Sequence, residues 1–448
     1  MPSASSKKIT ETSELRGNPQ IIRAWTIYDW ANSVYQLSIT SAILPAYYSA
    51  VAAGDAQGMV DFFGFQAVNT SLYAWAVSAS FLAVALMSPL LSSIADYTGR
   101  RKAFMQFFTW LGALSCMALY FFTPKNLEFG ILAFTLAGIG YSGGLVFYNA
   151  WLPEIAPPGQ EDRLSARGFA LGYIGGVVLL LFNLFMILKP EVFGLIKNGM
   201  AARISFVTVG IWWIVFASYT FYHLPSRLRS GERLRKPLLN GYRELREVWR
   251  QFQANPVMKR YLGGFFFTMM AVLTVMYMAA NFGKKELGLE DSVLIPTVLI
   301  IQLVGVLGAL FFARVSERIG NIRTLLITIG IWIGICLFAW VVETAAQFML
   351  LAAVVGWVMG AVQALARSSW SKLLPSQSDN TAFFSFYDVA EKMAVVSGTF
   401  LFGLLEMLTG SMRVSVVMLA ILFVLAAFFL WPLRDVARLA GTKKSSAT

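Results

Sequence analysis

A stripe of polar residues lies within the first apolar segment of the chain, between Arg23 and Thr40. Its members stand three, four, seven and eleven residues after the first, which places them on one face of a helix: Asp29, Asn32, Ser33, Gln36 and Thr40. An ionised carboxylate is costly in lipid, so this face must point into the protein or toward water. The stripe predicts a site for a polar solute or ion inside a membrane protein. The alternative is a structural hydrogen bond between helices.

A second group of charges lies in the eleventh apolar segment. Asp388 precedes Lys392 by four residues, the favourable order for an ion pair on one helix. Glu391 then lacks a partner on its own helix, unless Arg367 of the neighbouring segment supplies one. Burial without a partner would favour the protonated form of the acid. Glu391 and Asp29 are therefore the candidates for proton coupling.

The depth of the polar candidates along the expected helices suggests two overlapping sets. The residues that could form a gate of pairable charges near the inner mouth are Asp29, Asn149, Arg167, Arg367, Asp388 and Lys392. The residues that could line a substrate cavity are Asp29, Asn32, Gln36, Thr40, Tyr141, Tyr148, Asn149, Gln363 and Tyr277. The cavity set offers amides and hydroxyls, which suits a zwitterionic or neutral solute such as an amino acid. The aromatic content of 15% also allows an amphiphile or lipid-like cargo.

Other chemistries have little to build on in this chain. The single histidine, His223, ends a segment, and both cysteines, Cys116 and Cys336, sit in apolar surroundings without metal-ligand spacing. We find no nucleophile–base pair and no Walker-type phosphate loop. We therefore expect no enzyme activity, no metal and no cofactor.

The elements that position these residues are membrane helices. The chain is 57% hydrophobic and only 13% charged, whereas soluble chains are about one quarter charged. Many apolar runs reach the roughly 18–20 residues that cross a bilayer. The runs predict an all-α integral membrane protein with twelve helices, near residues 24–50, 69–95, 103–122, 127–152, 166–188, 202–223, 260–282, 293–315, 324–343, 347–370, 383–408 and 412–431.

The basic residues are distributed unequally between the connections. With this topology, the termini and the alternate connections on their side hold 28 of the 36 Lys and Arg residues, and the other connections hold 7. The positive-inside rule then places both termini in the cytoplasm. Topology explains the net charge of +12, so we expect no nucleic-acid partner.

The longest connection, 224–259, divides the helices six and six. Its apolar residues recur at helical spacing with arginines between them: Leu238, Tyr242, Leu245, Trp249 and Phe252. This pattern predicts an amphipathic helix on an anionic inner leaflet, or a helix that docks a partner. The predicted organisation is a cytoplasmic tail, a six-helix half, this linker, a second half and a second tail, at 1–23, 24–223, 224–259, 260–431 and 432–448.

The two halves are related by an internal repeat. Three pairs of residues keep an offset of 220 to 222 residues: Asp96 and Glu317, Cys116 and Cys336, and Pro153 and Pro375. The turn after the second helix carries a motif whose glycine permits a tight turn: Asp96, Gly99, Arg100 and Arg101. Two repeated six-helix halves describe a transporter of the major-facilitator type.

Glycines four residues apart mark close contacts between helices. The pairs are Gly168 and Gly172, Gly172 and Gly176, Gly140 and Gly144, and Gly356 and Gly360. They predict static close packing. The functional alternative is a smooth surface along which the two halves rock.

Five segments give a more specific resemblance. "IYDWANSVY" (27–35), "FYNAWLPEIA" (147–156), "RLSARGFALGYIGG" (163–176), "VQALARSSWSKLLP" (362–375) and "SFYDVAEKMAVVSG" (385–398) resemble the vacuole-effluxer family, also called autophagy-protein-twenty-two-like or unknown-major-facilitator. The resemblance covers essentially the whole chain. The short linker is similar to that of the bacterial members.

The resemblance implies a twelve-helix fold and a transport role, with fungal members linked to export of amino acids from the vacuole. We expect a monomeric alternating-access transporter of a small solute in the inner membrane of a bacterium, with proton coupling as one option. One alternative is an exporter of lysolipids, other amphiphiles or drugs on the same fold. Another is a membrane sensor or assembly factor that transports nothing.

Overall fold

The structure is a computed structural model that describes residues 15–52, 59–195, 199–226, 237–375 and 380–435. It confirms an all-α integral membrane protein. Eleven of the described helices are long and apolar enough to cross a membrane. They are α4 (Asn69–Thr98), α5 (Arg101–Ala118, continued by η2, Leu119–Phe121), α6 (Leu127–Asn149, followed by α7, Leu152–Ile155), α8 (Glu161–Leu188), α9 (Met200–His223), α11 (Pro256–Leu287), α12 (Asp291–Ile319), α13 (Asn321–Ala339), α14 (Ala345–Leu373), α15 (Asn380–Thr409) and α16 (Met412–Leu430, followed by η4, Trp431–Leu433). A short turn of 3₁₀ helix, η3 (Pro190–Phe193), separates α8 from α9.

The first membrane segment is divided into three helical pieces. These are α2 (Pro19–Val34), the π-helix η1 (Tyr35–Ile43) and α3 (Leu44–Val51). The segment begins five residues before the predicted position 24, because Asn18 Oδ1 accepts hydrogen bonds from the amides of Gln20 and Ile21 and Pro19 opens the first turn.

The π-helix places the polar stripe on two kinds of helix, with Asp29, Asn32 and Ser33 in α2 and Gln36 and Thr40 in η1. A π-helix turns more slowly per residue than an α-helix, so the 3.6-residue spacing ends at Tyr35. Asp29 and Gln36 both accept hydrogen bonds from tyrosines of α6, Tyr148 and Tyr141. Asp29 faces α14 and Gln36 contacts α6, while Ser33 lies where a Cβ on Gly172 of α8 would meet its Oγ at 2.4 Å.

Two short strands were absent from the sequence prediction. β1 (Met59–Phe62) pairs antiparallel with β2 (Phe65–Val68), with Phe62 opposite Phe65. The turn uses positive φ at Phe63 (51°) and Gly64 (84°), which a two-residue hairpin requires.

Helices near the turns extend beyond the predicted apolar runs. α12 continues to Ile319 instead of ending at 315, and α15 begins at Asn380 instead of 383. Polar residues continue these helices, because helical hydrogen bonding persists until a glycine with positive φ ends it. Gly99 (φ 69°) and Gly320 (φ 91°) are those glycines, and they confirm the predicted tight turn in both halves.

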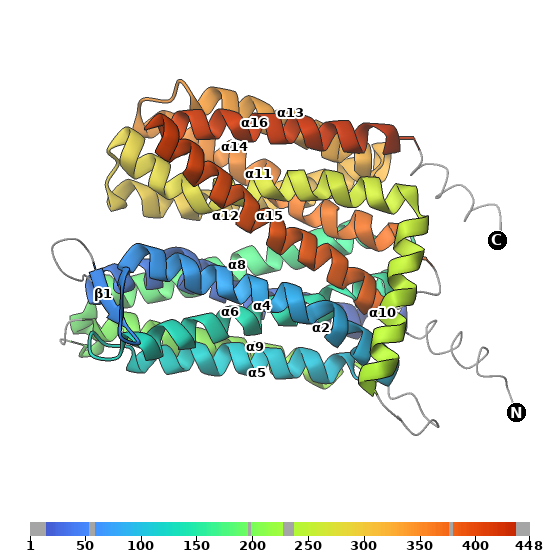
Figure 1. The fold of residues 1–448 in the computed structure, drawn as a ribbon, viewed down its shortest axis with the longest axis horizontal. Coiled ribbons are helices and arrows are strands. Elements are labelled where there is room, and N and C mark those ends of the chain that lie inside the picture. Colours follow the sequence, from blue (N-terminus) through green and yellow to red (C-terminus); the bar gives the residue numbers. More distant parts are fainter. Residues whose placement is uncertain (1–14, 53–58, 196–198, 227–236, 376–379, 436–448) are drawn as a thin grey trace, which may run out of the picture.

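The helices form two groups, α2–α9 and α11–α16, which Figure 1 shows one above the other. The buried apolar residues form one large cluster almost entirely in each group. The helix α10 (Pro237–Ala254) lies across one end of the bundle, where α2 begins and α16 ends, and the hairpin β1–β2 lies at the opposite end (Figure 1). We call these the α10 end and the hairpin end. The exact domain boundaries stay a prediction.

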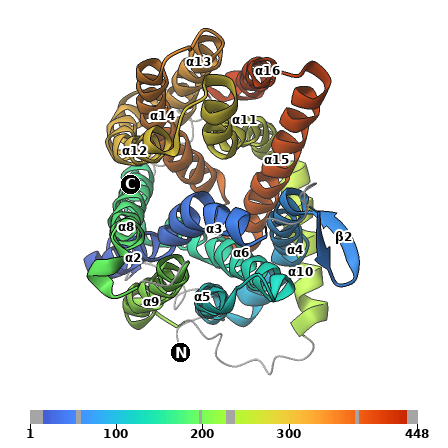
Figure 2. The ribbon, with the colours of Figure 1, turned by 90° about the vertical axis from the view of Figure 1, so that its left-hand side faces the viewer.

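The two groups meet along two pairs of helices. Figure 2, seen from the hairpin end, shows α8 beside α12 and α4 beside α15, and the tertiary contacts agree. Between these pairs, α3 and α6 face α11 and α14. The candidate residues on the first, fourth, seventh and tenth membrane segments therefore lie along the interior of the bundle.

The linker helix α10 rests on the bundle through part of its apolar face. Val248 and Phe252 are buried, and Phe252 stacks on Phe386 of α15 with ring centroids 5.7 Å apart. Tyr242 and Trp249, predicted on the same face, are 60% and 46% exposed. The apolar face is thus shared between the bundle and the surroundings.

The glycine pairs of α6 and α14 pack helices inside each half. A Cβ on Gly140 of α6 would lie 2.3 Å from the backbone nitrogen of Gly112 in α5. A Cβ on Gly360 of α14 would lie 2.2 Å from the carbonyl oxygen of Gly305 in α12. The alternative of a rocking surface between the halves is therefore wrong for these pairs, and close packing is confirmed.

We expect Gly140→Ala and Gly360→Ala to lower the thermal midpoint of the purified protein, because the added methyl meets backbone atoms that cannot rotate away. Overpacking of this kind costs about 1–3 kcal/mol. Gly334→Ala on α13 is the matched control, since its Cβ would meet nothing within 4 Å. Equal midpoints for all three variants would contradict the packing account.

Candidate functional site

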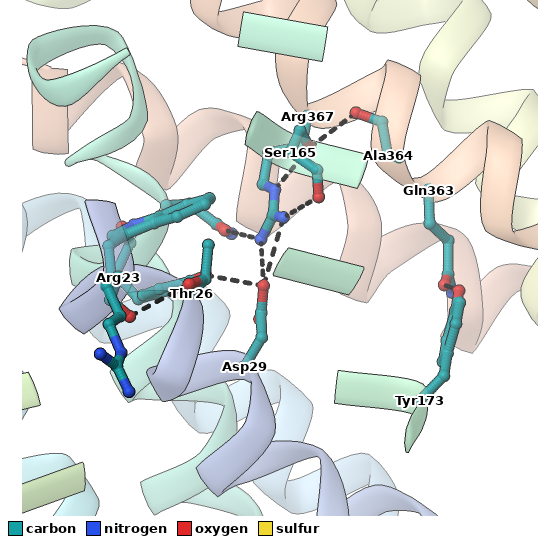
Figure 3. A network of polar contacts seen from close by, with 11 residues as sticks. Arg23, Thr26, Asp29, Ser165, Tyr173, Gln363, Ala364 and Arg367 are labelled. Atoms are coloured by element: carbon teal, nitrogen blue, oxygen red, sulfur yellow. Dashed lines mark hydrogen bonds and ion pairs between the residues drawn. The ribbon is translucent and has the colours of Figure 1, made fainter. Parts of the chain in front are cut away.

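The centre of the candidate site is an ion pair between the two halves. Asp29 of α2 and Arg367 of α14 point toward one another (Figure 3), with 3.3 Å between Arg367 Nη2 and Asp29 Oδ2. The side chain of Arg367 is 2% exposed and that of Asp29 is 6% exposed. The pair is buried and connects the first membrane segment to the tenth.

Arg367 has an acceptor for each of its five N–H groups. Nε donates to Ser165 Oγ at 2.9 Å, and Nη2 donates to the Ser165 carbonyl at 2.9 Å. Nη1 donates to Asn149 Oδ1 at 3.3 Å, and both Nη1 and Nη2 donate to Asp29 Oδ2. All three partners belong to the first half. The guanidinium therefore ties the tenth segment to three helices of the opposite half.

Aromatic rings enclose the pair. The guanidinium carbon of Arg367 lies 4.2 Å from the ring centroid of Phe169 and 4.9 Å from that of Trp25. The Tyr148 hydroxyl donates to Asp29 Oδ2 at 2.6 Å, and its ring stacks on Trp25 at 4.6 Å. These contacts replace water around both charges, which a buried ion pair requires.

A second contact between the halves is formed by the acid of the loop motif. Asp96 Oδ2 accepts a hydrogen bond from the amide of Ala382 at 3.0 Å, and Asp96 Oδ1 accepts one from the Thr381 hydroxyl. The carboxylate thereby caps the first turn of α15 in the opposite half, where negative charge is favoured. Arg101 pairs with Asp96 at 3.0 Å and with Glu154 at 2.9 Å. The motif acid thereby joins the end of α4 to the opposite half.

A third contact also joins the start of one helix to the end of another across the two halves. Here the acid lies at the helix start, and the hydroxyl donor lies near the helix end. Asp162 at the start of α8 accepts from Ser316 Oγ at 2.7 Å, Asn321 Nδ2 at 2.6 Å and Lys372 Nζ at 2.7 Å. Ser316 lies 220 residues after Asp96, the offset of the internal repeat. A carboxylate near the end of α4 in the first half therefore has a hydroxyl near the end of α12 in the second half as its counterpart.

The three contacts lie on the α10 side of the bundle. Gln36 follows Asp29 by seven residues, or about 10 Å of helix, toward the hairpin end. Gln36, Thr40, Tyr141, Tyr277 and Gln363 are all partly exposed, whereas the ion pair is buried. The polar residues on the hairpin side therefore have access to solvent that the ion pair lacks.

Two tyrosine–glutamine contacts lie on the hairpin side of the ion pair. Tyr141 of α6 donates from its hydroxyl to Gln36 Oε1 at 2.6 Å. Tyr173 of α8 donates in the same way to Gln363 Oε1 of α14, across the two halves (Figure 3). Both glutamine carbonyls thereby accept a hydrogen bond from a tyrosine hydroxyl. The one polar atom that Gln363 Nε2 contacts among the described residues is Met276 Sδ at 3.8 Å, a weak acceptor.

Several predicted residues lie elsewhere. Asn32, Tyr148 and Asn149 were predicted to line a cavity, but they are buried at 2%, 0% and 9% exposure. Tyr148 and Asn149 belong instead to the surroundings of Arg367. Arg167 was predicted at the gate, and the structure shows it exposed. The next residue, Gly168, occupies the position beside Asp29, so the Arg167 side chain lies on another face of α8.

The charges of the eleventh segment form their own group. Lys392 pairs with Asp388 at 2.9 Å, which confirms the predicted pair on one helix. Lys392 also lies 3.2 Å from Glu391, so the prediction that Glu391 lacks a partner on its own helix is wrong. Arg367 does not supply that partner, because Asp29, Asn149 and Ser165 occupy its donors.

Sequence reasoning missed Ser165, Asp162 and Tyr173. Ser165 and Tyr173 fall within the segment 163–176 that carries the family resemblance, and Asp162 precedes it directly. Their signal was a group of polar residues at the start of an apolar helix.

The fold defines the class of protein. Two crystal structures of major facilitator superfamily transporters superpose on the whole chain. FucP in its outward conformation has a TM-score of 0.68 at 12% identity, covering 93% of this chain and 98% of its own. The proton:xylose symporter XylE has a TM-score of 0.68 at 15% identity, covering 92% and 95%. The chain therefore has the fold of the major facilitator superfamily and is a multi-pass membrane protein.

The sequence defines the family within that class. The family described as "Vacuole effluxer Atg22 like" matches residues 17–438. The Bacillus subtilis protein "Uncharacterized MFS-type transporter YxiO" is 30% identical over 411 residues, covering 91% of this chain and 93% of its own length. "Autophagy-related protein 22" of Chaetomium globosum is 24% identical over 458 residues, covering 81% and 69%. The chain belongs to the Atg22-like vacuole effluxer family, which confirms the resemblance.

We expect Arg367→Gln to open the α10 end. The substitution leaves the buried carboxylate of Asp29 with the Tyr148 hydroxyl as its remaining donor, and breaking a buried ion pair costs about 3–5 kcal/mol. An introduced cysteine, Ala313→Cys, lies buried where the two halves meet. It should react faster with a water-soluble maleimide in Arg367→Gln.

Arg318→Gln is the matched control, because this arginine is exposed at the same end of the bundle. Both native cysteines are fully buried and give a low background. An unchanged labelling rate in Arg367→Gln would show that the ion pair does not close this end.

Proposed function

We propose that the chain is a secondary transporter that works by alternating access on a small zwitterionic or neutral solute, with an amino-acid-like zwitterion favoured. The observation that carries this proposal is the buried Asp29–Arg367 pair between the halves, with partly exposed amides and hydroxyls on its hairpin side. A closed layer beside an accessible polar lining is the arrangement of one state in an alternating-access cycle.

The ion pair acts as a gate and does not bind the solute in this state. Every N–H group of Arg367 has a protein acceptor, and Asp29 Oδ2 already accepts from Tyr148 and Arg367. A solute would have to displace these partners at the cost of buried, unpaired charges. Opening of the α10 end exchanges the pair's internal hydrogen bonds for water.

The glutamines determine the chemistry of the lining. Because Gln36 and Gln363 use their carbonyl oxygens on tyrosine hydroxyls, they offer amide N–H donors to a bound solute. Two convergent donors suit a carboxylate or a pair of hydroxyls. The partly exposed carboxylate of Glu391 and the hydroxyl of Tyr277 provide acceptors for an ammonium group. This division of donors and acceptors supports a zwitterion.

A thermal-shift screen of the purified protein with amino acids, dipeptides, sugars, nucleosides and lysolipids tests the solute class. A ligand at 100 times its Kd should add about 2.7 kcal/mol of stability. We expect a shift with amino acids that Gln36→Ala abolishes. Gln251→Ala, an exposed glutamine on α10, is the control and should keep the shift.

The other outcomes assign the alternatives. A shift with lysolipids alone would favour the amphiphile exporter. No shift with any class would favour a sensor or assembly factor, particularly if Gln36→Ala left the physiological role intact while loss of α10 abolished it.

We further propose that the α10 end faces the cytoplasm of a bacterium and that the monomer is the transporting unit. Arg243, Arg246 and Arg250 are exposed on α10 together with Tyr242 and Trp249. Basic and aromatic side chains on one exposed helix suit the headgroups of an anionic inner leaflet. The positive-inside rule gives the same orientation.

The orientation is tested with Gln251→Cys on α10. An impermeant maleimide should label it in inverted membrane vesicles and leave it unlabelled in right-side-out vesicles. Lys125→Cys, exposed at the hairpin end, should show the opposite pattern. The reverse result for both cysteines would invert the proposed topology.

A further inference from the structure

Three charged side chains of α15 form a compact triad inside the membrane region. Lys392 Nζ lies 2.9 Å from Asp388 Oδ1 and 3.2 Å from Glu391 Oε2. The side chains of Asp388 and Lys392 are 3% and 6% exposed, and that of Glu391 is 25% exposed. The triad is separate from the Asp29–Arg367 pair. Of its three members, only Glu391 is among the proposed solute contacts.

The charges of the triad do not balance. Two carboxylates and one ammonium leave a net charge of −1 when all three are ionised. Asp388 Oδ2 is buried without a hydrogen-bond partner. A buried carboxylate oxygen with no donor is costly, and a net charge within the membrane adds to this cost. One added proton removes the net charge, and on Asp388 it also lowers the cost of the unpartnered oxygen, because a neutral carboxyl is less costly to bury than a carboxylate.

Among the described residues, both ion pairs of the triad lie within α15. Tyr141 of α6 and Tyr277 of α11 interact electrostatically with Glu391 through their hydroxyls. α4 presents the ring of Phe81, whose centroid lies 5.9 Å from Lys392 Nζ. Four charged groups on the elements packed against α15 have partners away from the triad: Asp96 with Arg101, Arg413 with Glu286, Arg250 with Glu247, and Lys285 with Glu406. Lys259 and Arg260 of α11 are exposed near the start of that helix.

The geometry selects a proton over a larger cation. A metal cation takes several oxygen ligands, and the described residues contain no group of three or more acidic, histidine or cysteine side chains that could hold a metal. Lys392 already occupies the space between the two carboxylates. Asp388 Oδ2 has no accessible surface for an ammonium group, whereas a proton needs no additional room.

We infer that the Asp388–Glu391–Lys392 triad binds one proton and is the coupling site of the transporter. The proton adds to a carboxylate of Asp388 or Glu391 to give a neutral carboxyl, and Lys392 keeps its charge and its bond to the other carboxylate. Glu391 is the entry point because it is the partly exposed member. This inference rests on the proposed transport function for the purpose of the proton, and the proton site itself is tested without any solute.

The position of the triad explains how proton binding would reach the gate. Lys392 faces Phe81 of α4, the helix whose Asp96 caps the start of α15 at Thr381 and Ala382. A neutral triad tolerates this apolar contact between the halves. A triad of charge −1 favours water, and therefore separation of α15 from α4. Proton binding accordingly stabilises the closed α10 end, and release favours its opening.

Infrared difference spectroscopy of the purified full-length protein tests the site directly. Spectra are compared between about pH 5 and about pH 9, a range that includes perturbed carboxyl groups. We expect a carboxylic-acid C=O band that persists into the neutral range. Asp388→Asn and Glu391→Gln should each abolish it, because each leaves one acid neutralised by Lys392. Lys392→Met should increase the band about twofold, since both acids then lack a cation and remain protonated at neutral pH.

Glu406→Gln is the matched control, because Glu406 lies on the same helix and pairs with Lys285 at 2.6 Å. It should leave the band unchanged, and the thermal midpoint of each variant confirms that it is folded. A wild-type spectrum without the band would overturn the inference, as would a band that survives both acid substitutions or disappears in Asp29→Asn. The transport proposal would stand in each case, because its solute screen does not depend on this band.

Discussion

The structure depends on one electrostatic constraint. A guanidinium buried between two halves of a membrane protein is tolerated only when each of its donors has an acceptor. Arg367 meets this condition through Ser165, Asn149 and Asp29, which come from three helices of the opposite half. The rest of the arrangement follows from that geometry. Gly168 must lack a side chain, since a Cβ would lie 2.3 Å from Asp29 Oδ2 and 2.9 Å from Arg367 Nη2. The same interaction that stabilises one state must be broken to reach the other.

The internal repeat supports this central contact from two sides. Asp96 meets the start of α15, and Asp162 at the start of α8 meets Ser316. Both contacts join the end of one helix to the start of another. The acid lies near the end of α4 in the first contact and at the start of α8 in the second. Each of the two contacts thus has one carboxylate that accepts hydrogen bonds from the opposite half. Only the turn after α4 retains the full acidic and basic motif. Such contacts are polar and satisfied at close range, so they can be exchanged for water with little net change in free energy. This property suits a protein that must open and close repeatedly.

The sequence was sufficient for the helices and for the depth of the charges. Backbone groups in lipid must be satisfied within a helix, so apolar run length alone predicts the spans. The layer of Asp29, Asn149 and Arg367 could be predicted from their positions along three helices. The partners could not, because pairing depends on helix rotation. The π-helix from Tyr35 to Ile43 interrupts the α-helical spacing of the first segment, and nothing in the run of apolar residues indicates it. Lys392 was assigned to Asp388 by spacing, but its contact with adjacent Glu391 depends on side-chain conformation.

The measurement that tests this account most directly is the pair of distances across the two ends of the bundle. Spin labels at Arg100→Cys and Glu317→Cys report on the α10 end, and labels at Lys125→Cys and Glu343→Cys report on the hairpin end; all four positions are exposed. The account predicts that Asp29→Asn combined with Arg367→Gln lengthens the first distance and shortens the second in the same population of molecules. Two distances that stay unchanged, or that change independently of one another, would contradict a gate built on the Asp29–Arg367 pair.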